Sequence, residues 1–375
     1  MTGGPVKGAP SPFSKELPKL QLAWDATSLD VLLKCPRRYQ YSIIEGFRSS
    51  SVDTEFGGYF AEAVEVYKKA RLAGSNKEDA TIAALNFTIE RTWLPATEDH
   101  PDGFPWGGSY DEQWRCEGTE PFKNAKGNRA KCPWSHKGAW FPGPAPDVCG
   151  TCGSHTHSER RWVSNDNAKD RYTLVRLVAW YADEQPERPE DALHPIQFAD
   201  GTPAVELSWS LPLPYRASTG EPFILAGHFD SVSAYGSEHF ITDNKTTGKT
   251  IGPRYFEQFS PNTQMDTYDL AGSLLFPDMN LRGVMVEVAQ TLVGGAHFGL
   301  GASYRTESYR EEWFKEMKYW LDQADKFAQD DYWPMNRANC FLCQFKMVCK
   351  VDPGSRQQYL EANFKVRKWN PLEER

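Results

Sequence analysis

The sequence lacks any run of eighteen or more apolar residues, and residues 1–19 (MTGGPVKGAPSPFSKELPK) lack the apolar stretch of a secretory signal. We therefore expect no membrane partner and a cytoplasmic location. The sequence also lacks an excess of positive charge, since its formal net charge is -8. This charge argues against a protein that coats nucleic acid by bulk charge, although a local basic channel is compatible with an acidic average.

Disulfide bonds are not expected either. In a reducing compartment the eight cysteines are metal ligands or buried thiols more readily than disulfides, and their spacing favours ligands. What the sequence does contain is enough apolar material for a sizeable core: 40% of its residues are hydrophobic. With 375 residues, the chain is long enough for one large domain with insertions or for two domains.

Changes of composition divide the chain into five parts. The predicted parts are a flexible arm (1–20), an N-terminal helical part (21–93), a loop-like, cysteine-rich insertion (94–168), a core (169–350) and a C-terminal tail (351–375). A short first helix is predicted to begin at Thr27 or Ser28, either of which can cap it, and to end at Pro36. Apolar spacing predicts further helices at 55–72, 78–93, 170–182, 256–275 and 306–329. Alternation predicts strands at 204–213, 223–230, 240–245 and 281–292.

The stretch 223–245 predicts a β-hairpin that turns at Gly236. In an extended chain residues two apart share a face, so Asp243 and Lys245 point the same way and Asn244 points the other way. If the strands pair, Asp230 can join the first two. Two carboxylates and an ammonium group at one place suit a divalent cation and an activated water, which is the equipment for hydrolysing phosphodiesters.

Four cysteines in the insertion have the spacing Cys-x15-Cys-x16-Cys-x2-Cys, with His136, His155 and His157 nearby. A Cys-x2-Cys pair is a common half of a tetrahedral zinc site, and two further thiolates complete such a site. Four thiolates leave no open position on the ion, so the spacing predicts a structural zinc rather than a catalytic one. The expected ligands are Cys116, Cys132, Cys149 and Cys152.

The remaining cysteines form a second set. Three lie near the C-terminus with the spacing Cys-x2-Cys-x5-Cys and need a fourth ligand, and the cysteine left over is Cys35, at the end of the first predicted helix. Ligation by thiolates alone suits an iron–sulfur cluster or zinc. The predicted set is Cys35, Cys340, Cys343 and Cys349.

Taken in order, these motifs resemble the iron–sulfur branch of the PD-(D/E)XK nucleases, which includes RecB-like and AddB-type recombination nuclease domains and CRISPR adaptation nucleases. The resemblance covers residues 28–350. It depends on five signatures in sequence: Cys35-Pro-Arg-Arg-Tyr, Gly227-x-x-Asp230, Asp243-x-Lys245, Gln264-x-x-x-Tyr268 and Cys340-x2-Cys343-x5-Cys349.

The resemblance implies an α/β fold of the restriction-endonuclease type, with a mixed central sheet flanked by helices. It implies Mg²⁺ or Mn²⁺ held by Asp230 and Asp243, an attacking water oriented by Lys245, and Gln264 and Tyr268 along the path of DNA. Glu206 matches a supporting acid on the strand before the hairpin. The second cysteine set would hold a structural 4Fe–4S cluster that joins the two ends of the domain.

Two features depart from the family pattern. Ala61 stands where the family usually has a histidine, so Glu62 or Glu65 is expected to complete the metal shell, or activity is weakened. The insertion 94–168 is not required by the family, and is expected to be a zinc-bound lid or a contact for DNA or a protein partner. The resemblance favours a metal-dependent deoxyribonuclease acting on DNA ends or single strands, in recombination, repair or phage DNA processing. The alternatives are a catalytically silent DNA-binding subunit and a CRISPR adaptation nuclease that trims ends.

Overall fold

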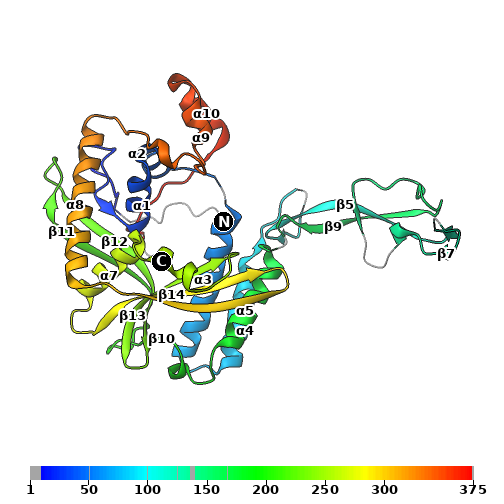
Figure 1. The fold of residues 1–375 in the computed structure, drawn as a ribbon, viewed down its shortest axis with the longest axis horizontal. Coiled ribbons are helices and arrows are strands. Elements are labelled where there is room, and N and C mark those ends of the chain that lie inside the picture. The colour runs from blue at the N-terminus through cyan, green and yellow to red at the C-terminus, as the bar shows by residue number, and fades with distance from the viewer. Residues whose placement is uncertain are drawn as a thin grey trace. The chain divides into compact units, whose positions relative to one another are not determined.

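The structure, a computed structural model, describes residues 10–49, 51–98, 100–124, 126–135, 140–166 and 168–373. His136 lies outside these residues. The chain divides into two compact units (Figure 1). The larger is formed by Met1–Arg91 with Leu174–Arg375 and the smaller by Thr92–Thr173. None of the helices in the described ranges has the length and apolar character needed to cross a membrane.

A seven-stranded mixed sheet forms the centre of the larger unit, as expected. Its main path runs β1-β12-β13-β14-β15, and β10 and β11 both pair with β12. β13 and β14 are parallel, whereas β12–β13 and β14–β15 are antiparallel. The strands are β1 (Ala23–Trp24), β10 (His194–Pro195), β11 (Val205–Arg216), β12 (Pro222–Tyr235), β13 (Glu238–Thr247), β14 (Leu281–Leu292) and β15 (Gly295–Ser303).

Helices flank this sheet. The first group packs together over one face and consists of α1 (Ala26–Lys34), α7 (Thr263–Leu275) and α8 (Glu307–Gln329). On the other face, α3 (Val52–Leu72) and α5 (Arg171–Glu184) contact side chains of the sheet, and α4 (Lys77–Arg91) packs against α3. Shorter helices are α2 (Pro36–Tyr39), with a π-helical turn at Gln40–Ile44, and α6 (Pro253–Phe256), α9 (Lys346–Lys350) and α10 (Arg356–Asn363).

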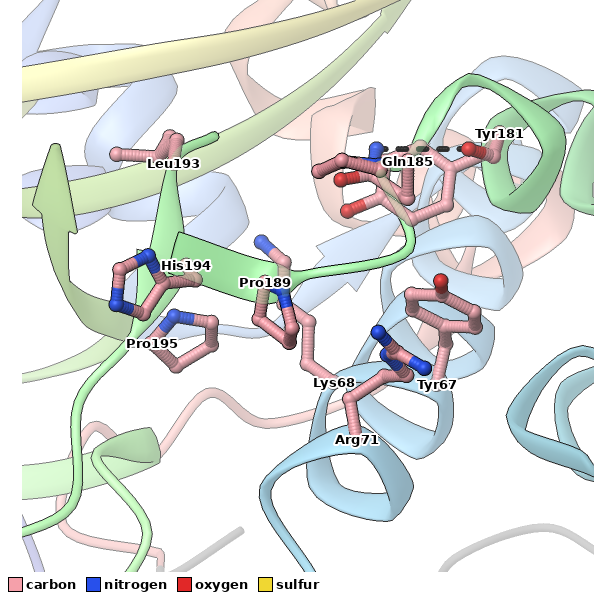
Figure 2. A pocket seen from close by; sticks show the side chains of 10 residues that line it. Tyr67, Lys68, Arg71, Tyr181, Gln185, Pro189, Leu193, His194 and Pro195 are labelled. Carbon is pink, nitrogen blue, oxygen red and sulfur yellow. Dashed lines mark hydrogen bonds between the residues drawn. The ribbon is translucent and has the colours of Figure 1, made fainter. Parts of the chain in front are cut away.

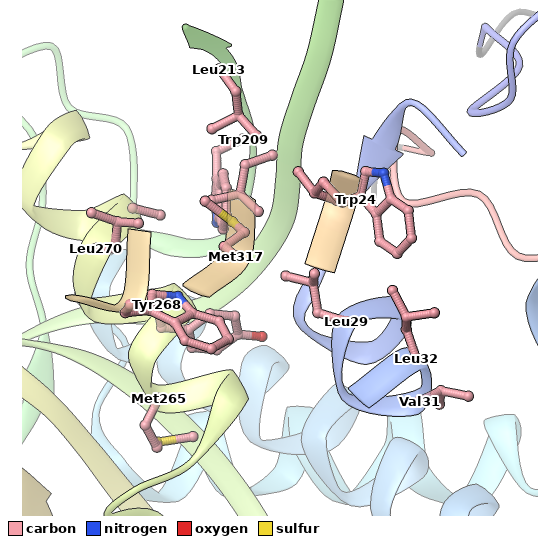
Figure 3. Close-up of a cluster of buried hydrophobic side chains, with 14 of the residues drawn as sticks. Trp24, Leu29, Val31, Leu32, Trp209, Leu213, Met265, Tyr268, Leu270 and Met317 are labelled. Atoms are coloured by element: carbon pink, nitrogen blue, oxygen red, sulfur yellow. The ribbon is translucent and has the colours of Figure 1, made fainter. Parts of the chain in front are cut away.

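The main core lies between the sheet and the first group of helices (Figure 3). Phe223, Leu225 and Phe229 of β12 are at most 1% exposed, because their alternation places all three on one face of the strand. Trp24 stacks on Tyr39 with ring centroids 5.3 Å apart. A tightly packed core of this kind holds α7 in a defined position on the sheet.

The predicted helix at 256–275 is wrong in its first half. The chain instead forms α6, a 3-10 turn at Glu257–Phe259, and then α7. Pro261 has no amide hydrogen for a helix interior. Asn262 starts α7 as its N-cap, because its side chain accepts hydrogen bonds from the amides of Gln264 and Met265.

Residues 10–20, predicted as part of a flexible arm, include buried residues that contact the larger unit. Ser14 and Leu20 are buried, and the Ser14 amide donates to the Leu20 carbonyl at 2.9 Å. The tail from 351 onward also contains regular structure, namely α10 and β16 (Lys365–Val366), which pairs with β2 (Phe47–Arg48). Apolar residues such as Leu20 and Leu360 are buried in these segments. For residues 10–20 this burial explains why their polar composition did not indicate their packing.

The smaller unit is richer in strands than its loop-like sequence indicated, and that prediction is wrong. β5 (Gly108–Cys116) pairs along its length with β9 (Thr156–Ser164), and β8 (Phe141–Pro142) adds a third strand. The remaining pairs are β3 (Trp93–Leu94) with β4 (Phe104–Pro105), and β6 (Phe122–Lys123) with β7 (Arg129–Ala130). Most residues of β5 and β9 are exposed or half-buried, so these strands lack the alternation from which strands are predicted.

Candidate active site

The predicted hairpin forms, and its register brings two acids together. The β12–β13 ladder ends at the pair Ser231–Thr242, and Asp230 and Asp243 are the next residues beyond that pair. The two acids are close enough for the charge of Asp230 to act on the carboxyl group of Asp243. Gly236 makes the turn with a φ of 61°, in the left-handed region that glycine adopts readily. The Lys245 ammonium lies on the same face as Asp243, where Nζ donates to Oδ1 of Asp243 at 2.9 Å.

Helix α7 brings Gln264 to this pair. The Gln264 amide nitrogen donates to Oδ1 of Asp243 at 3.0 Å, and its amide oxygen accepts from Lys245 Nζ at 3.0 Å. The same nitrogen is 3.1 Å from the Tyr268 hydroxyl, one helical turn further on. Four of the predicted site residues therefore form one connected cluster, in which Gln264 holds both the carboxylate and the ammonium group.

Burial sets the electrostatics of the cluster. Asp243 is 2% exposed. Burial, together with the nearby charge of Asp230, raises the pKa of Asp243 to about 6, although Lys245 acts in the opposite direction. Burial lowers the pKa of Lys245, but the charge and hydrogen bond of Asp243 outweigh it, so this pKa lies above its usual value. Lys245 is consequently a cation at neutral pH.

Asp230 is held differently. Its Oδ2 accepts hydrogen bonds from the backbone amide of Asn244 at 2.7 Å and from the Asn244 side-chain amide at 3.1 Å. Glu206 lies in β11 between the pairs Val205–Ser231 and Leu207–Phe229, which places it beside Asp230 in the sheet. Its φ of 53° is unusual for a residue that is not glycine, and such backbone strain often occurs at functional sites.

Behind Asp230 is a polar network that the sequence analysis missed. Asn244 points to the opposite face from Asp243, as expected, and its Oδ1 lies 3.4 Å from Lys68 Nζ of α3. Lys68, only 5% exposed, also donates to Glu287 of β14 at 2.7 Å, and Tyr181 of α5 donates to Glu287 at 3.1 Å. The one available signal was Glu287, the single acid in a largely apolar predicted strand at residues 281–292.

The network borders a pocket between α3 and the segment that follows α5 (Figure 2). Lys68 and Tyr181 line it together with Arg71, which comes from the next turn of α3. The other lining residues are Tyr67, Gln185, Pro186, Pro189, Leu193, His194 and Pro195. This pocket adjoins the network rather than the Asp243 cluster.

The acids predicted on α3 have other partners. Glu62 accepts from Arg91 Nε of α4 at 2.7 Å, and Glu65 forms an ion pair with Lys69 one turn away. The structure thus does not bring either acid into the hydrogen-bonded cluster around Asp243. Helix α3 does approach β13, since a Cβ on Gly57 would lie 3.2 Å from Oγ1 of Thr246.

The residues fit a hard divalent cation. Oδ2 of Asp243 is buried and accepts no hydrogen bond of good geometry from the described residues, although Lys245 Nζ lies 2.8 Å away. The Lys245 ammonium already compensates part of the charge of this buried carboxylate, and a bound cation would add to that compensation. Carboxylate oxygens are the ligands that Mg²⁺ and Mn²⁺ prefer, and Asp230, whose charge acts on Asp243, supplies a second carboxylate nearby.

Two carboxylates and a lysine on the β12–β13 hairpin, joined by a glutamine from α7, are the kinds of group that metal-dependent phosphodiester hydrolases use. The sequence profile described as the PD-(D/E)XK nuclease superfamily matches residues 151–350, more than half of the chain, and the chain belongs to this superfamily. No curated protein matches the chain significantly.

The first cysteine set forms a compact cluster in the smaller unit. The Sγ atoms of Cys116, Cys132, Cys149 and Cys152 all lie within 4.8 Å of one another. Sγ of Cys116 lies 3.4 Å from Sγ of Cys152, and Sγ of Cys132 lies 3.8 Å from Sγ of Cys149. Thiolates bound to one tetrahedral zinc stand about 3.8 Å apart. The Gly118 amide also points at Sγ of Cys116, at 3.3 Å. The four thiols can therefore hold one metal ion.

The second set lies where the N-terminal helices meet the C-terminal segment. The Asn336 amide donates to Sγ of Cys35 at 3.3 Å, and the Lys34 carbonyl accepts from the side chains of Asn336 and Asn339. Burial, with Cys343 and Cys35 also acting, raises the pKa of the Cys349 thiol. These contacts bring the segment around Cys340 beside Cys35.

Proposed function

We propose that this protein is a Mg²⁺- or Mn²⁺-dependent deoxyribonuclease of the RecB-like, iron–sulfur branch that acts on DNA ends or single strands. Its expected settings are recombination, repair or phage DNA processing. The observation that carries the proposal is the three-way contact of Asp243, Lys245 and Gln264, because it unites a metal ligand, a cation and an orienting amide at one point.

Each residue has a separate part in this reaction. Asp243 and Asp230 would hold the ion, which when bound neutralises the scissile phosphate and lowers the pKa of its water. Lys245 Nζ donates a hydrogen bond that orients the nucleophile. Gln264 keeps the ammonium beside the carboxylate, and Tyr268 holds the amide in the orientation that does so.

The two cysteine sets have structural roles in the proposal. Cys116, Cys132, Cys149 and Cys152 hold zinc. The other set holds a 4Fe–4S cluster, for which the thiolates must stand farther apart than around a single ion. Anaerobically purified protein should then be brown, and Cys340→Ala should lose both the colour and the iron. Colourless protein that carries only zinc would overturn this assignment.

The direct test is cleavage of labelled single-stranded and duplex DNA by the anaerobic protein, with and without Mg²⁺ or Mn²⁺. We expect metal-dependent cutting that Asp243→Asn abolishes, whereas Asp200→Asn, which alters an exposed loop acid, should cut normally. Equal cutting by both variants would refute the proposed site.

Ala61 favours a second candidate, the catalytically silent DNA-binding subunit. A silent subunit would bind DNA without cutting it at any metal concentration. The third candidate, a CRISPR adaptation nuclease, shares the same site chemistry, and the neighbouring genes would distinguish it.

A further inference from the structure

The β6–β7 hairpin of the smaller unit is strongly basic. Residues 122–131 read FKNAKGNRAK and contain four cations and no acid, in a chain whose net charge is -8. All four cations are exposed, and the ion pairs found among the described residues include none of them. In contrast, Arg161 in the adjacent three-stranded sheet is paired with Glu159 at 3.2 Å. The four cations are Lys123, Lys126, Arg129 and Lys131.

The hairpin has a defined shape. The Asn124 side chain accepts hydrogen bonds from the amides of Lys126 and Asn128 at 3.0 and 3.1 Å, and the Asn124 amide donates to the Asn128 carbonyl at 3.0 Å. Gly127 completes the turn with a φ of 75°. The cationic side chains thus extend from a segment whose described residues are joined by hydrogen bonds, so their binding costs less conformational entropy than it would on a disordered tail.

The cysteine cluster holds the base of this hairpin. Cys116 ends β5 and Cys132 follows β7, so two of the four thiols enclose the hairpin in sequence. Phe122 packs against the cluster, and the Glu120 amide donates to Oγ of Ser154 at 2.8 Å. Metal binding by the four thiols would therefore constrain both ends of the hairpin.

We propose that the β6–β7 hairpin is a second DNA-binding site, which contacts backbone phosphates and depends on the metal-bound cysteine cluster for its shape. Uncompensated lysine and arginine on an ordered turn suit a regular row of phosphates, and such contacts carry no sequence preference. Protein interfaces instead depend on buried aromatic or aliphatic anchors, and the exposed positions of this hairpin carry only Lys, Arg, Asn and Gly. The identity of the polyanion as DNA rests on the proposed function.

The test measures DNA affinity without cleavage. The parent is the full chain with Asp243→Asn, and fluorescence anisotropy reports binding of labelled single-stranded and duplex DNA over a range of KCl concentrations. The hairpin variant is Lys123→Gln/Lys126→Gln/Arg129→Gln. The matched control, Lys315→Gln/Lys318→Gln/Lys326→Gln, removes the same charge from exposed positions of α8.

We expect the hairpin variant to bind duplex DNA at least about tenfold more weakly than the parent at low salt. The slope of the logarithm of its association constant against the logarithm of the KCl concentration should be shallower by about 2 to 3. The affinity of the control should stay within about twofold of the parent's. Equal affinity of parent and hairpin variant overturns the inference while leaving the proposed function intact. Equal weakening by both variants identifies a bulk charge effect and also overturns it. If the parent itself fails to bind DNA, the proposed function fails as well.

Two further arms complete the test. Polyglutamate of similar length should bind far more weakly than DNA, and equal binding would identify an acidic protein as the partner instead. The variant Cys149→Ser/Cys152→Ser should no longer bind the cluster's metal, which mass spectrometry of the intact protein would show. Its DNA affinity should fall to about the same extent as that of the hairpin variant. Metal loss with unchanged affinity would overturn the dependence on the cluster.

Discussion

At the scale of single residues, the site combines two carboxylates with different environments. Asp243 is buried and its pKa is raised to about 6, whereas Asp230 is half-buried and accepts two hydrogen bonds from Asn244. The first carboxylate is costly to bury, so Lys245 and a bound cation are both favourable there. The second carboxylate needs orientation, which the network behind it supplies.

Asn244→Ala should weaken catalysis without unfolding the protein. The Asp230 carboxylate would keep the backbone amide of residue 244 but lose the side-chain bond at 3.1 Å. Because groups that orient metal ligands typically contribute 10–100-fold, we expect a loss of about that size in kcat, with more Mg²⁺ needed for half-maximal rate. The control is Asn363→Ala on α10. An unchanged Mg²⁺ requirement would contradict the orienting role.

Lys68→Met should destabilise the larger unit strongly. It leaves Glu287 as a nearly buried, uncompensated charge, for which the usual cost is about 3–5 kcal/mol. Urea unfolding should show this loss, and the double variant Lys68→Met/Glu287→Gln should recover much of it. If single and double variants unfold alike, the ion pair is not the cause.

At the scale of elements, the position of α7 on the sheet determines where Gln264 lies. A Cβ on Gly272 would come within 2.9 Å of Cγ1 of Ile241 in β13. Glycine therefore permits the close approach of α7 to the strand that carries Asp243 and Lys245.

Gly272→Ala should lower both stability and activity. Overpacking costs typically 1–3 kcal/mol, which exceeds the roughly 1 kcal/mol that alanine gains over glycine in a helix. We expect a net loss of about 1 kcal/mol in thermal unfolding and a lower kcat as α7 shifts. Gly248→Ala, where a Cβ meets nothing within 4 Å, is the control. A more stable and fully active Gly272→Ala would show that α7 is not tightly seated.

The hairpin and the long helices could be predicted from the sequence because their periodicity directly reflects one buried face. In β12 the alternate positions Phe223, Leu225, Gly227 and Phe229 are all buried, and in α8 the buried residues recur mostly every third or fourth position. The start of α7 was missed because a proline and an asparagine cap override a continuous apolar pattern. The Lys68 network was missed because its residues come from α3, α5, β13 and β14, and only tertiary packing brings them together. The long exposed strands of the smaller unit had no periodic signal at all.

At the scale of the whole molecule, the two units are stabilised in different ways. The larger unit has an extended apolar core, whereas a separate buried cluster in the smaller unit consists mainly of cysteines. Small units with little core commonly depend on a metal for their fold.

Removal of metal from the cysteine cluster should therefore affect mainly the smaller unit. After treatment with a zinc chelator, limited proteolysis followed by mass spectrometry should find new cuts within 92–173, while the larger unit stays protected. Cys132→Ser should give the same cuts without the chelator. Protection of 92–173 in both cases would contradict a structural metal.

The central claim is that Asp243 and Lys245 carry out metal-dependent phosphodiester hydrolysis. The most direct test is single-turnover cleavage of saturating labelled DNA at a fixed Mn²⁺ concentration by wild-type protein and Lys245→Met. We predict that the variant binds DNA with nearly unchanged affinity and cleaves it at least about 10²-fold more slowly, because the group that orients the attacking water is gone. Cleavage at the wild-type rate by Lys245→Met would contradict the account.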